Sequence, residues 1–149
     1  LEAAVTIKNY IIAIAGGIQR AENSDPKKNE FISRRHYLGY RFNDNLLIRA
    51  GRFYPAYGIN IPEHASVIKR GLRWDQGQEI YNLEVNYLKD NLEIFVTGLF
   101  GRPDQNKNNT DKGFSLSPSY SITDKIKVGV NYLKAESDQY ERTLYGFHT

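Results

Sequence analysis

The sequence contains no cysteine and no methionine among its 149 residues. The absence of cysteine excludes a disulfide framework, thiol chemistry and a cysteine-based zinc site. The absence of methionine means that Leu1 is not a translation start, so we expect a processed chain or a piece of a longer protein. No secretory signal remains at Leu1, as is expected of a mature exported protein.

A long hydrophobic segment is also missing. The longest apolar run, Ile11–Ile18, is far shorter than the roughly 20 residues that a membrane-spanning helix needs. The mean hydropathy is low, at −0.57, yet the chain contains 11 tyrosines. This combination suits a membrane β-barrel, because only alternate residues of each strand meet lipid, and it equally suits a secreted β-sandwich.

Strong charge of either sign is absent as well. The net charge is +3, and the lysines and arginines are scattered along the chain. A nucleic-acid-binding protein needs a basic patch or stripe, so we expect no nucleic-acid partner.

What the sequence does contain is apolar/polar alternation with the period of a β-strand, most clearly in Glu79–Phe100. Two strands there flank the turn Lys89-Asp90-Asn91. In the first strand one face carries Tyr81, Leu83, Val85 and Tyr87, and the other carries Asn82, Glu84 and Asn86. A strand between lipid and a wet lumen needs such faces, although a half-buried soluble hairpin shows the same alternation.

The same pattern recurs along the chain and predicts about eight strands and no helix. Besides the two strands of Glu79–Phe100, the predicted strands are Val5–Glu22, Phe31–Phe42, Leu46–Tyr54, Gly113–Ile122, Ile126–Leu133 and Thr143–Thr149. Pro118 predicts a local irregularity within its strand, because proline donates no ladder hydrogen bond.

The connections between these strands alternate between short and long. Short turns are predicted at Asn43–Asn45, Lys89–Asn91 and Thr123–Lys125, and long connections at Asn23–Glu30, Pro55–Gln78 and Gly101–Lys112. Short turns at one end and long loops at the other are typical of an up-and-down membrane barrel. The apolar side chains of Pro55–Gln78 predict that this connection folds into the lumen, where it would cover Phe95 and Leu99.

The outward faces carry aromatic residues at two heights, as in the girdles of a membrane barrel. Tyr10, Tyr40, Phe42, Tyr87 and Tyr120 are predicted near one interface, and Tyr81, Phe100, Phe114 and Tyr132 near the other. Arg34 and His36 share the parity of an apolar face, so we expect them at the rim, against a neighbouring chain, or beside a bulge. Ser33 is predicted on the opposite, lumen face.

The segment RAGRFYPAYG (Arg49–Gly58) resembles a feature of the outer-membrane porins, most of all those of the phosphate-selective type. In those families a strand ending in an Arg-x-Gly-aromatic pattern enters a proline-containing loop that ends in glycine. The following segment Arg70–Tyr87 is similar to the re-entry into the next strand. The resemblance implies a barrel of about 16 strands, of which this chain would be a fragment. A complete barrel of about eight strands is the rival prediction.

Basic side chains are the first candidates for a functional site. Several have the parity of the lumen face, others lie on the long connection, and rings of Arg and Lys favour anions. We predict pore-lining and selectivity residues at Arg35, Arg41, Arg49, Lys69, Arg70, Arg73, Glu84, Glu93 and Lys127. The two glutamates would cancel part of the positive charge.

Hydrolysis is the second candidate chemistry. His36, His64 and His148 fall on different elements, and spacing places no serine or aspartate beside any of them. We therefore predict that the protein is not an enzyme and that the histidines lie at rims or in loops.

Metal binding is the third candidate. Asp104, Asn106 and Asn108 alternate as in a calcium loop, but Asn109 replaces the turn glycine and Ser115 replaces the bidentate glutamate. We therefore expect a solvated loop, with neither a metal nor a cofactor.

Together these patterns predict an all-β, antiparallel up-and-down transmembrane barrel in the bacterial outer membrane. The predicted function is a porin-like channel for passive diffusion of small hydrophilic solutes, with anion preference as one option. The alternatives are a structural barrel that serves as a scaffold for envelope proteins and an outer-membrane hydrolase. The expected partners are outer-membrane lipid, small hydrophilic or anionic solutes, and a second copy or an envelope protein.

Overall fold

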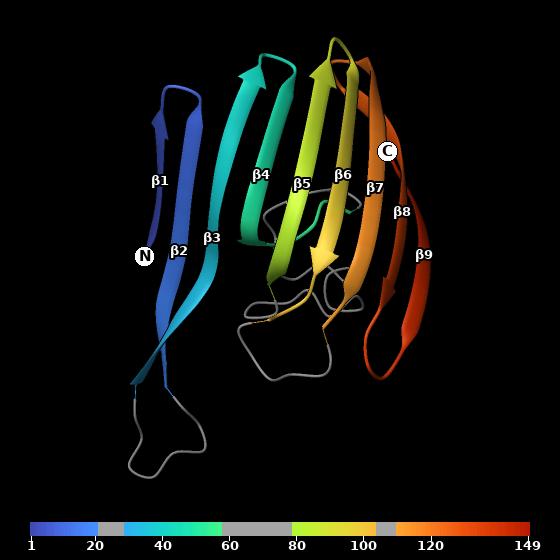
Figure 1. Cartoon of the computed structure of the whole chain (residues 1–149). Coiled ribbons are helices and arrows are strands. Elements are labelled where there is room, and N and C mark those ends of the chain that lie inside the picture. The colour runs from blue at the N-terminus through green and yellow to red at the C-terminus, as the bar shows by residue number, and fades with distance from the viewer. Residues whose placement is uncertain (21–28, 58–78, 104–109) are drawn as a thin grey trace.

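The chain forms one antiparallel sheet of nine strands in which every strand pairs with its neighbours in sequence (Figure 1). The computed structural model describes residues 1–20, 29–57, 79–103 and 110–149. All eight pairings are antiparallel, so the strands run up and down in the order β1 to β9. The all-β, up-and-down prediction is confirmed.

The strand number predicted from the pattern is wrong by one, because the first predicted strand is a hairpin. The strands are β1 Glu2–Ile7, β2 Tyr10–Arg20, β3 Asn29–Asn43, β4 Leu46–Phe53, β5 Ile80–Lys89, β6 Leu92–Phe100, β7 Lys112–Thr123, β8 Ile126–Glu136 and β9 Glu141–His148. Lys8 adopts a positive φ of 53°, which lets Lys8-Asn9 reverse the chain inside the predicted Val5–Glu22 strand. Alternation continues across such a tight turn, so the pattern alone does not reveal it.

All the tight turns lie at one end of the sheet, as Figure 1 shows. They are Lys8-Asn9, Asp44-Asn45, Asp90-Asn91 and Asp124-Lys125, and Asp90 also has a positive φ, of 52°. The other connections leave from the opposite end, which we call the loop end. The predicted alternation of short and long connections is therefore confirmed, with each short turn one residue tighter than expected.

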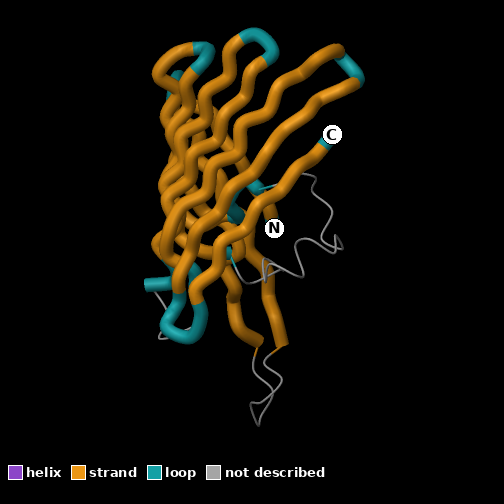
Figure 2. Tube along the Cα trace, turned by 90° about the vertical axis from the view of Figure 1, so that its right-hand side faces the viewer, coloured by secondary structure: helices purple, strands orange, loops and turns teal. Residues whose placement is uncertain are grey.

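The sheet is open, with β1 and β9 as its two edges. Figure 2 shows that it curls, so that one face is concave and the other convex. The rival prediction of a complete, closed barrel of about eight strands is wrong for this chain. The nine strands do not meet edge to edge.

The registers keep one set of side chains on the convex face across the whole sheet. On β4 and β5, for example, Ile48 pairs with Val85, and Val85 in turn pairs with Val96 of β6. Pro118 keeps this register, but the β7–β8 ladder has no partner pair for it or for Ser117. This interruption confirms the predicted irregularity, because proline has no N–H to donate.

One bulge changes the face of several residues in β3. Ala15 pairs with Arg35 and Gly16 with Ser33, so Arg34 is an extra residue in the ladder. The prediction that Ser33 faces the lumen is therefore wrong, because a bulge shifts the parity of the residues beyond it. Ser33 and His36 both lie on the convex face, near the loop end of β3.

The start of the β4–β5 connection lies on the concave face. Tyr54 and Tyr57 pack against a cluster of buried apolar side chains that includes Ile80, Leu99 and Leu133. The Ser117 hydroxyl, on β7, donates a hydrogen bond of 3.0 Å to the carbonyl of Ala56. Side chains directly after β4 therefore contact the cluster that includes Leu99. The prediction that Pro55–Gln78 folds into the lumen falls mostly on residues 58–78, outside the described part, and stays a prediction.

Gly51 supplies a test of the close β3–β4 pairing. Its φ is +141°, and a Cβ there would lie 2.3 Å from the His36 carbonyl oxygen. We expect Gly51→Ala to lower the free energy of unfolding by about 2 kcal/mol, measured from urea midpoints of the folded protein. Gly17→Ala is the matched control, because a Cβ at Gly17 meets nothing within 4 Å. Equal midpoints for the two variants would contradict this pairing geometry.

Candidate functional site: the polar concave face

The centre of the concave face holds a buried ion pair between β4 and β5. Arg49 pairs with Glu84 in the ladder, and the Arg49 Nε donates to the Glu84 Oε1 at 2.7 Å. The Thr97 hydroxyl, on β6, donates to the other carboxylate oxygen at 3.0 Å. Glu84 is only 1% exposed, so both of its oxygens need partners in place of water. The strand alternation puts all three side chains on one face.

Two aromatic rings hold the Arg49 guanidinium from the side. Its central carbon lies 4.3 Å from the centre of the Phe53 ring and 5.4 Å from that of Tyr37. Tyr37 and Phe53 also contact each other, with ring centres 5.6 Å apart. A cation over aromatic faces is stabilised by the ring quadrupole, so Arg49 has a defined position. Spacing along the sequence gave no sign that these rings contact Arg49.

The other predicted charges on this face are also paired or lie at its margin. Lys127 forms an ion pair with Glu93 near the turn end. Arg35 contacts Glu2 of β1 at 3.2 Å, with both side chains largely exposed. Arg41 is exposed beside the Lys8-Asn9 turn, where its backbone N–H donates to the Asn9 carbonyl.

The structure therefore brings the predicted site residues together in opposite-charge pairs. Arg49 meets Glu84, and Lys127 meets Glu93. Lys69, Arg70 and Arg73 lie outside the described residues, and their predicted role stays a prediction. Arg35 and Arg41 lie on β3, the strand next to Arg49, at four and two residues from its ladder partner Gly39.

Serine side chains on β7 attach the residues after β4 to the concave face. The Ser115 and Ser117 hydroxyls donate to the same carbonyl, that of Ala56, at 3.5 and 3.0 Å. Tyr57 reaches as far as β9, where a Cβ at Gly146 would lie 3.0 Å from the Tyr57 hydroxyl oxygen. Burial raises the pKa of the Tyr57 phenol, and the charge of Arg142 partly opposes this shift. The backbone after β4 therefore crosses the concave face from β4 toward β9.

Two further polar clusters lie at the loop end, and the pattern predicted neither. Arg52 donates through Nε to the Glu79 carbonyl at 3.1 Å and contacts its carboxylate at 3.4 Å. Tyr54 donates to the same carboxylate at 3.1 Å. At the other side Arg142 pairs with Asp111, which also accepts from the Tyr140 hydroxyl at 3.2 Å. These contacts join residues far apart in sequence, so spacing could not reveal them.

The convex face is apolar over the middle of every described strand from β2 to β8. The positions there are Ile12, Ile14, Leu38, Ile48, Ala50, Leu83, Val85, Ile94, Val96, Gly98, Leu116, Pro118, Val128 and Val130. None of these residues is charged. Most of their larger side chains are exposed, Val96 at 45% and Val130 at 55% for example.

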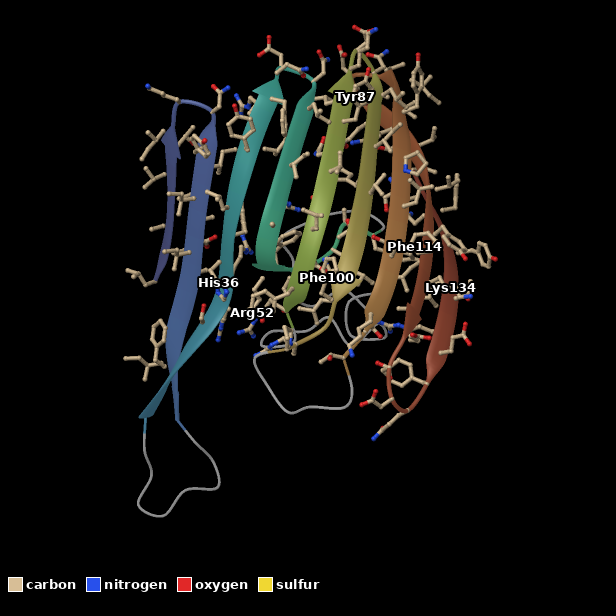
Figure 3. All side chains as sticks on the ribbon, in the orientation of Figure 1. His36, Arg52, Tyr87, Phe100, Phe114 and Lys134 are labelled. Carbon is tan, nitrogen blue, oxygen red and sulfur yellow. The ribbon has the colours of Figure 1, made fainter. Side chains whose placement is uncertain are left out.

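Aromatic side chains border that apolar band at both ends (Figure 3). At the turn end Tyr10, Tyr40 and Phe42 form a row with ring centres 4.8–4.9 Å apart. At the loop end Phe114 and Tyr132 form the start of a second row, with centres 5.5 Å apart. The predicted sorting of aromatics by height is confirmed, and Tyr145 joins the second row beside Tyr132.

Two of the three histidines have polar neighbours that the sequence did not indicate. His36 Nδ1 lies 2.8 Å from the Ser33 hydroxyl, and His36 Nε2 lies 3.1 Å from the Tyr81 hydroxyl. His148 Nδ1 lies 3.0 Å from the Asn131 amide. His64 falls outside the described residues. The expectation that no serine stands beside a histidine is therefore wrong for His36, because the bulge at Arg34 turns Ser33 to its side.

The described ranges contain no group of three or more histidine, aspartate or glutamate side chains that could hold a metal ion. The predicted calcium-like positions Asp104, Asn106 and Asn108 lie in the part that is not described. Nor do the described residues include a helix with the length and hydrophobicity needed to cross a bilayer. No protein-family model matches the sequence, and a search of curated proteins also finds no match.

The Arg49–Glu84 pair gives a direct test of the concave face. We expect Glu84→Gln to cost about 2 kcal/mol of unfolding free energy, because it leaves Arg49 with no counter-charge in a largely buried place. Glu93→Gln, the same change on the neighbouring strand, should cost less than about 1 kcal/mol, because the side chain of its partner Lys127 is 46% exposed and water can solvate its charge. Urea midpoints of both variants measure the difference. A larger loss for Glu93→Gln would contradict the assigned burial.

Proposed function

We propose that this chain forms part of the wall of an outer-membrane β-barrel that acts as a porin-like channel for small hydrophilic solutes. The observation that carries the proposal is the contrast between its faces. The convex face is an uncharged apolar band between two aromatic rows, and the concave face carries charged, amide and hydroxyl side chains beside a buried apolar cluster. A transmembrane barrel needs lipid-facing and lumen-facing surfaces of these kinds.

The dimensions of the apolar band support a membrane location. From Tyr81 at one aromatic row to Tyr87 at the other, β5 rises on the order of 20 Å. The apolar band of an outer-membrane barrel is about 25 Å tall, with aromatic girdles at both interfaces. Tight turns at one end and long connections at the other are also the arrangement of such barrels, whose short turns face the periplasm.

The concave face supports a polar pathway without a strong charge preference. Arg49 is offset by Glu84 and Lys127 by Glu93, so the described face carries charges of both signs in contact. Rings of unpaired Arg or Lys would be needed to attract anions strongly. We therefore propose small hydrophilic solutes in general, and leave anion preference to the predicted contribution of Lys69, Arg70 and Arg73.

The open sheet supports a barrel larger than these nine strands. In a strictly alternating antiparallel sheet, β1 and β9 run in the same direction, because nine is an odd number. They cannot pair with each other in the antiparallel manner found elsewhere in the sheet. Antiparallel closure of the barrel thus requires an odd number of further strands between β9 and β1.

The alternative function is a structural barrel that holds other envelope proteins. The observation in its favour is the occupied concave face, where the backbone after β4 crosses from β4 toward β9. A scaffold needs the same lipid-facing surface, but it does not need an open path for solutes. Conductance therefore separates the two functions.

A charge at the centre of the convex face tests the membrane location. We expect Val96→Arg to reduce the folding free energy in lipid vesicles by about 2–4 kcal/mol, the cost of a cation at the bilayer midplane. Ile122→Arg, on the same face beside the turn end, should cost about 1 kcal/mol or less. Urea titration of both variants in vesicles gives the two values. In a soluble sheet Val96→Arg would be nearly neutral, and such a result would exclude a lipid-facing surface.

Planar-bilayer recording of the intact polypeptide tests the channel. We expect stepwise increases in current that disappear when the same preparation is unfolded by heat before addition. In a salt gradient the reversal potential should stay close to zero if the charge pairs dominate the pathway. Changing Arg70 and Arg73 together to Glu tests the remaining anion preference. No current steps from a protein that does insert into vesicles would favour the scaffold instead.

A further inference from the structure

The convex face carries a second arrangement of polar residues, separate from the proposed pathway. Ser33, His36 and Tyr81 lie there together on β3 and β5, at the loop end of the apolar band. The Ser33 hydroxyl oxygen is 2.8 Å from His36 Nδ1, and His36 Nε2 is 3.1 Å from the Tyr81 hydroxyl oxygen. Figure 3 shows His36 beside Arg52 at this end of the sheet. A channel has no evident use for this chain of contacts.

We propose that Ser33 and His36 form a nucleophile–base pair that cleaves carboxylic esters of acyl lipids at the membrane interface. A serine becomes nucleophilic when an adjacent base accepts its proton, and that base must be oriented by a third group. Here Tyr81 orients the imidazole. For Nδ1 to accept from Ser33, the Nε2–H must donate to the Tyr81 oxygen, which selects the required tautomer.

The bulge in β3 creates this pair. Ser33 and His36 are three residues apart, so in a regular strand they would lie on opposite faces, because side chains alternate. The ladder skips Arg34, and this shifts Ser33 to the face of His36. Bulges are frequent beside active sites, where they redirect a side chain. Arg34 has no partner in the registers of β3 with β2 or with β4. The Arg34 backbone N–H lies next to the nucleophile. We assign it as the donor that stabilises the negatively charged oxygen formed when Ser33 attacks the ester carbonyl.

The surroundings of Ser33 fit an acyl chain on one side. Across the ladder from Ser33 stands Gly16, which has no side chain to obstruct the hydroxyl. Toward the apolar band the same face continues with Ile14 and Leu38, each exposed at 52%. On the other side of His36 lie the polar residues Arg52 and Tyr81. An amphiphile can therefore place its chain on the apolar side and its ester beside Ser33.

The reaction is a balanced acyl transfer. The Ser33 oxygen attacks the ester carbonyl carbon while its proton moves to His36 Nδ1. The ester C–O bond then breaks, and the departing alcohol oxygen takes that proton, leaving the acyl group on Ser33. Water attacks the acyl group, giving one proton to Nδ1, and the carboxylic acid leaves as that proton returns to Ser33. Water is the only co-reactant.

A fluorophosphonate tests the pair independently of the channel and of the membrane location, because this probe is small and soluble. The intact polypeptide, folded in detergent micelles, should acquire a phosphonyl adduct on the peptide that contains Ser33, detected by mass spectrometry. His36→Gln should slow labelling by about a hundredfold or more. Ser121→Ala, on the concave face, should label as fast as the wild type, and Ser33→Ala should not label. Circular dichroism and thermal midpoints show whether each variant is folded.

Two results would overturn the proposal: a folded wild type that acquires no adduct, or a folded His36→Gln variant that labels at the wild-type rate. The substrate class is tested separately by fatty-acid release from a short-chain diacylphosphatidylcholine. An adduct on Ser33 without such release would overturn the lipid substrate. Tyr81→Phe should lower kcat about tenfold with KM unchanged, as expected of a residue that orients the base. An unchanged kcat would remove Tyr81 from this role.

Discussion

The antiparallel hydrogen-bond ladder is the constraint on which the rest of this structure depends. Side chains alternate along each strand, so the register between strands decides which of them share a face. From β3 to β6 the registers align Leu38, Ile48, Val85 and Val96 on one face and Arg49, Glu84 and Thr97 on the other. A slip of one residue in any pairing would turn a whole apolar set into the polar face. The separation of the two faces is thus a property of pairing rather than of any single contact.

The curl of the sheet then makes polar partners necessary on the concave face. Side chains there converge, and several of the polar ones are buried, among them Asn82, Glu84, Thr97, Ser115 and Asn131. Buried polar groups are costly without hydrogen bonds. Glu84 receives them from Arg49 and Thr97, and the β7 serines donate to the backbone after β4. These hydrogen bonds stabilise the concave face. They also leave polar atoms along it, and a path for hydrophilic solutes requires such atoms.

The departures from regular alternation are informative because each has a local cause. The turn at Lys8-Asn9 divides one predicted strand into two. The extra residue Arg34 moves Ser33 to the convex face and brings it to His36. Period-two reasoning found most strands and assigned the central faces, including the lumen parity of Arg49 and Lys127. It marked Arg34 and His36 as out of phase and gave a bulge as one of three explanations, which the register confirms. It could not choose among the three, since a bulge inserts one residue without a distinctive sequence at that point.

By itself, the sequence determined the all-β class, the positions of three of the four tight turns, the central apolar and polar faces and the heights of the aromatic rows. These are local properties of alternation and turn chemistry, so they can be read from neighbouring residues. Only the tertiary structure decided that nine strands form an open sheet, that Arg49 is held by Glu84 and two rings, and that Ser33 meets His36 and Tyr81. Those features depend on register, curl and a bulge, which bring together residues from different strands.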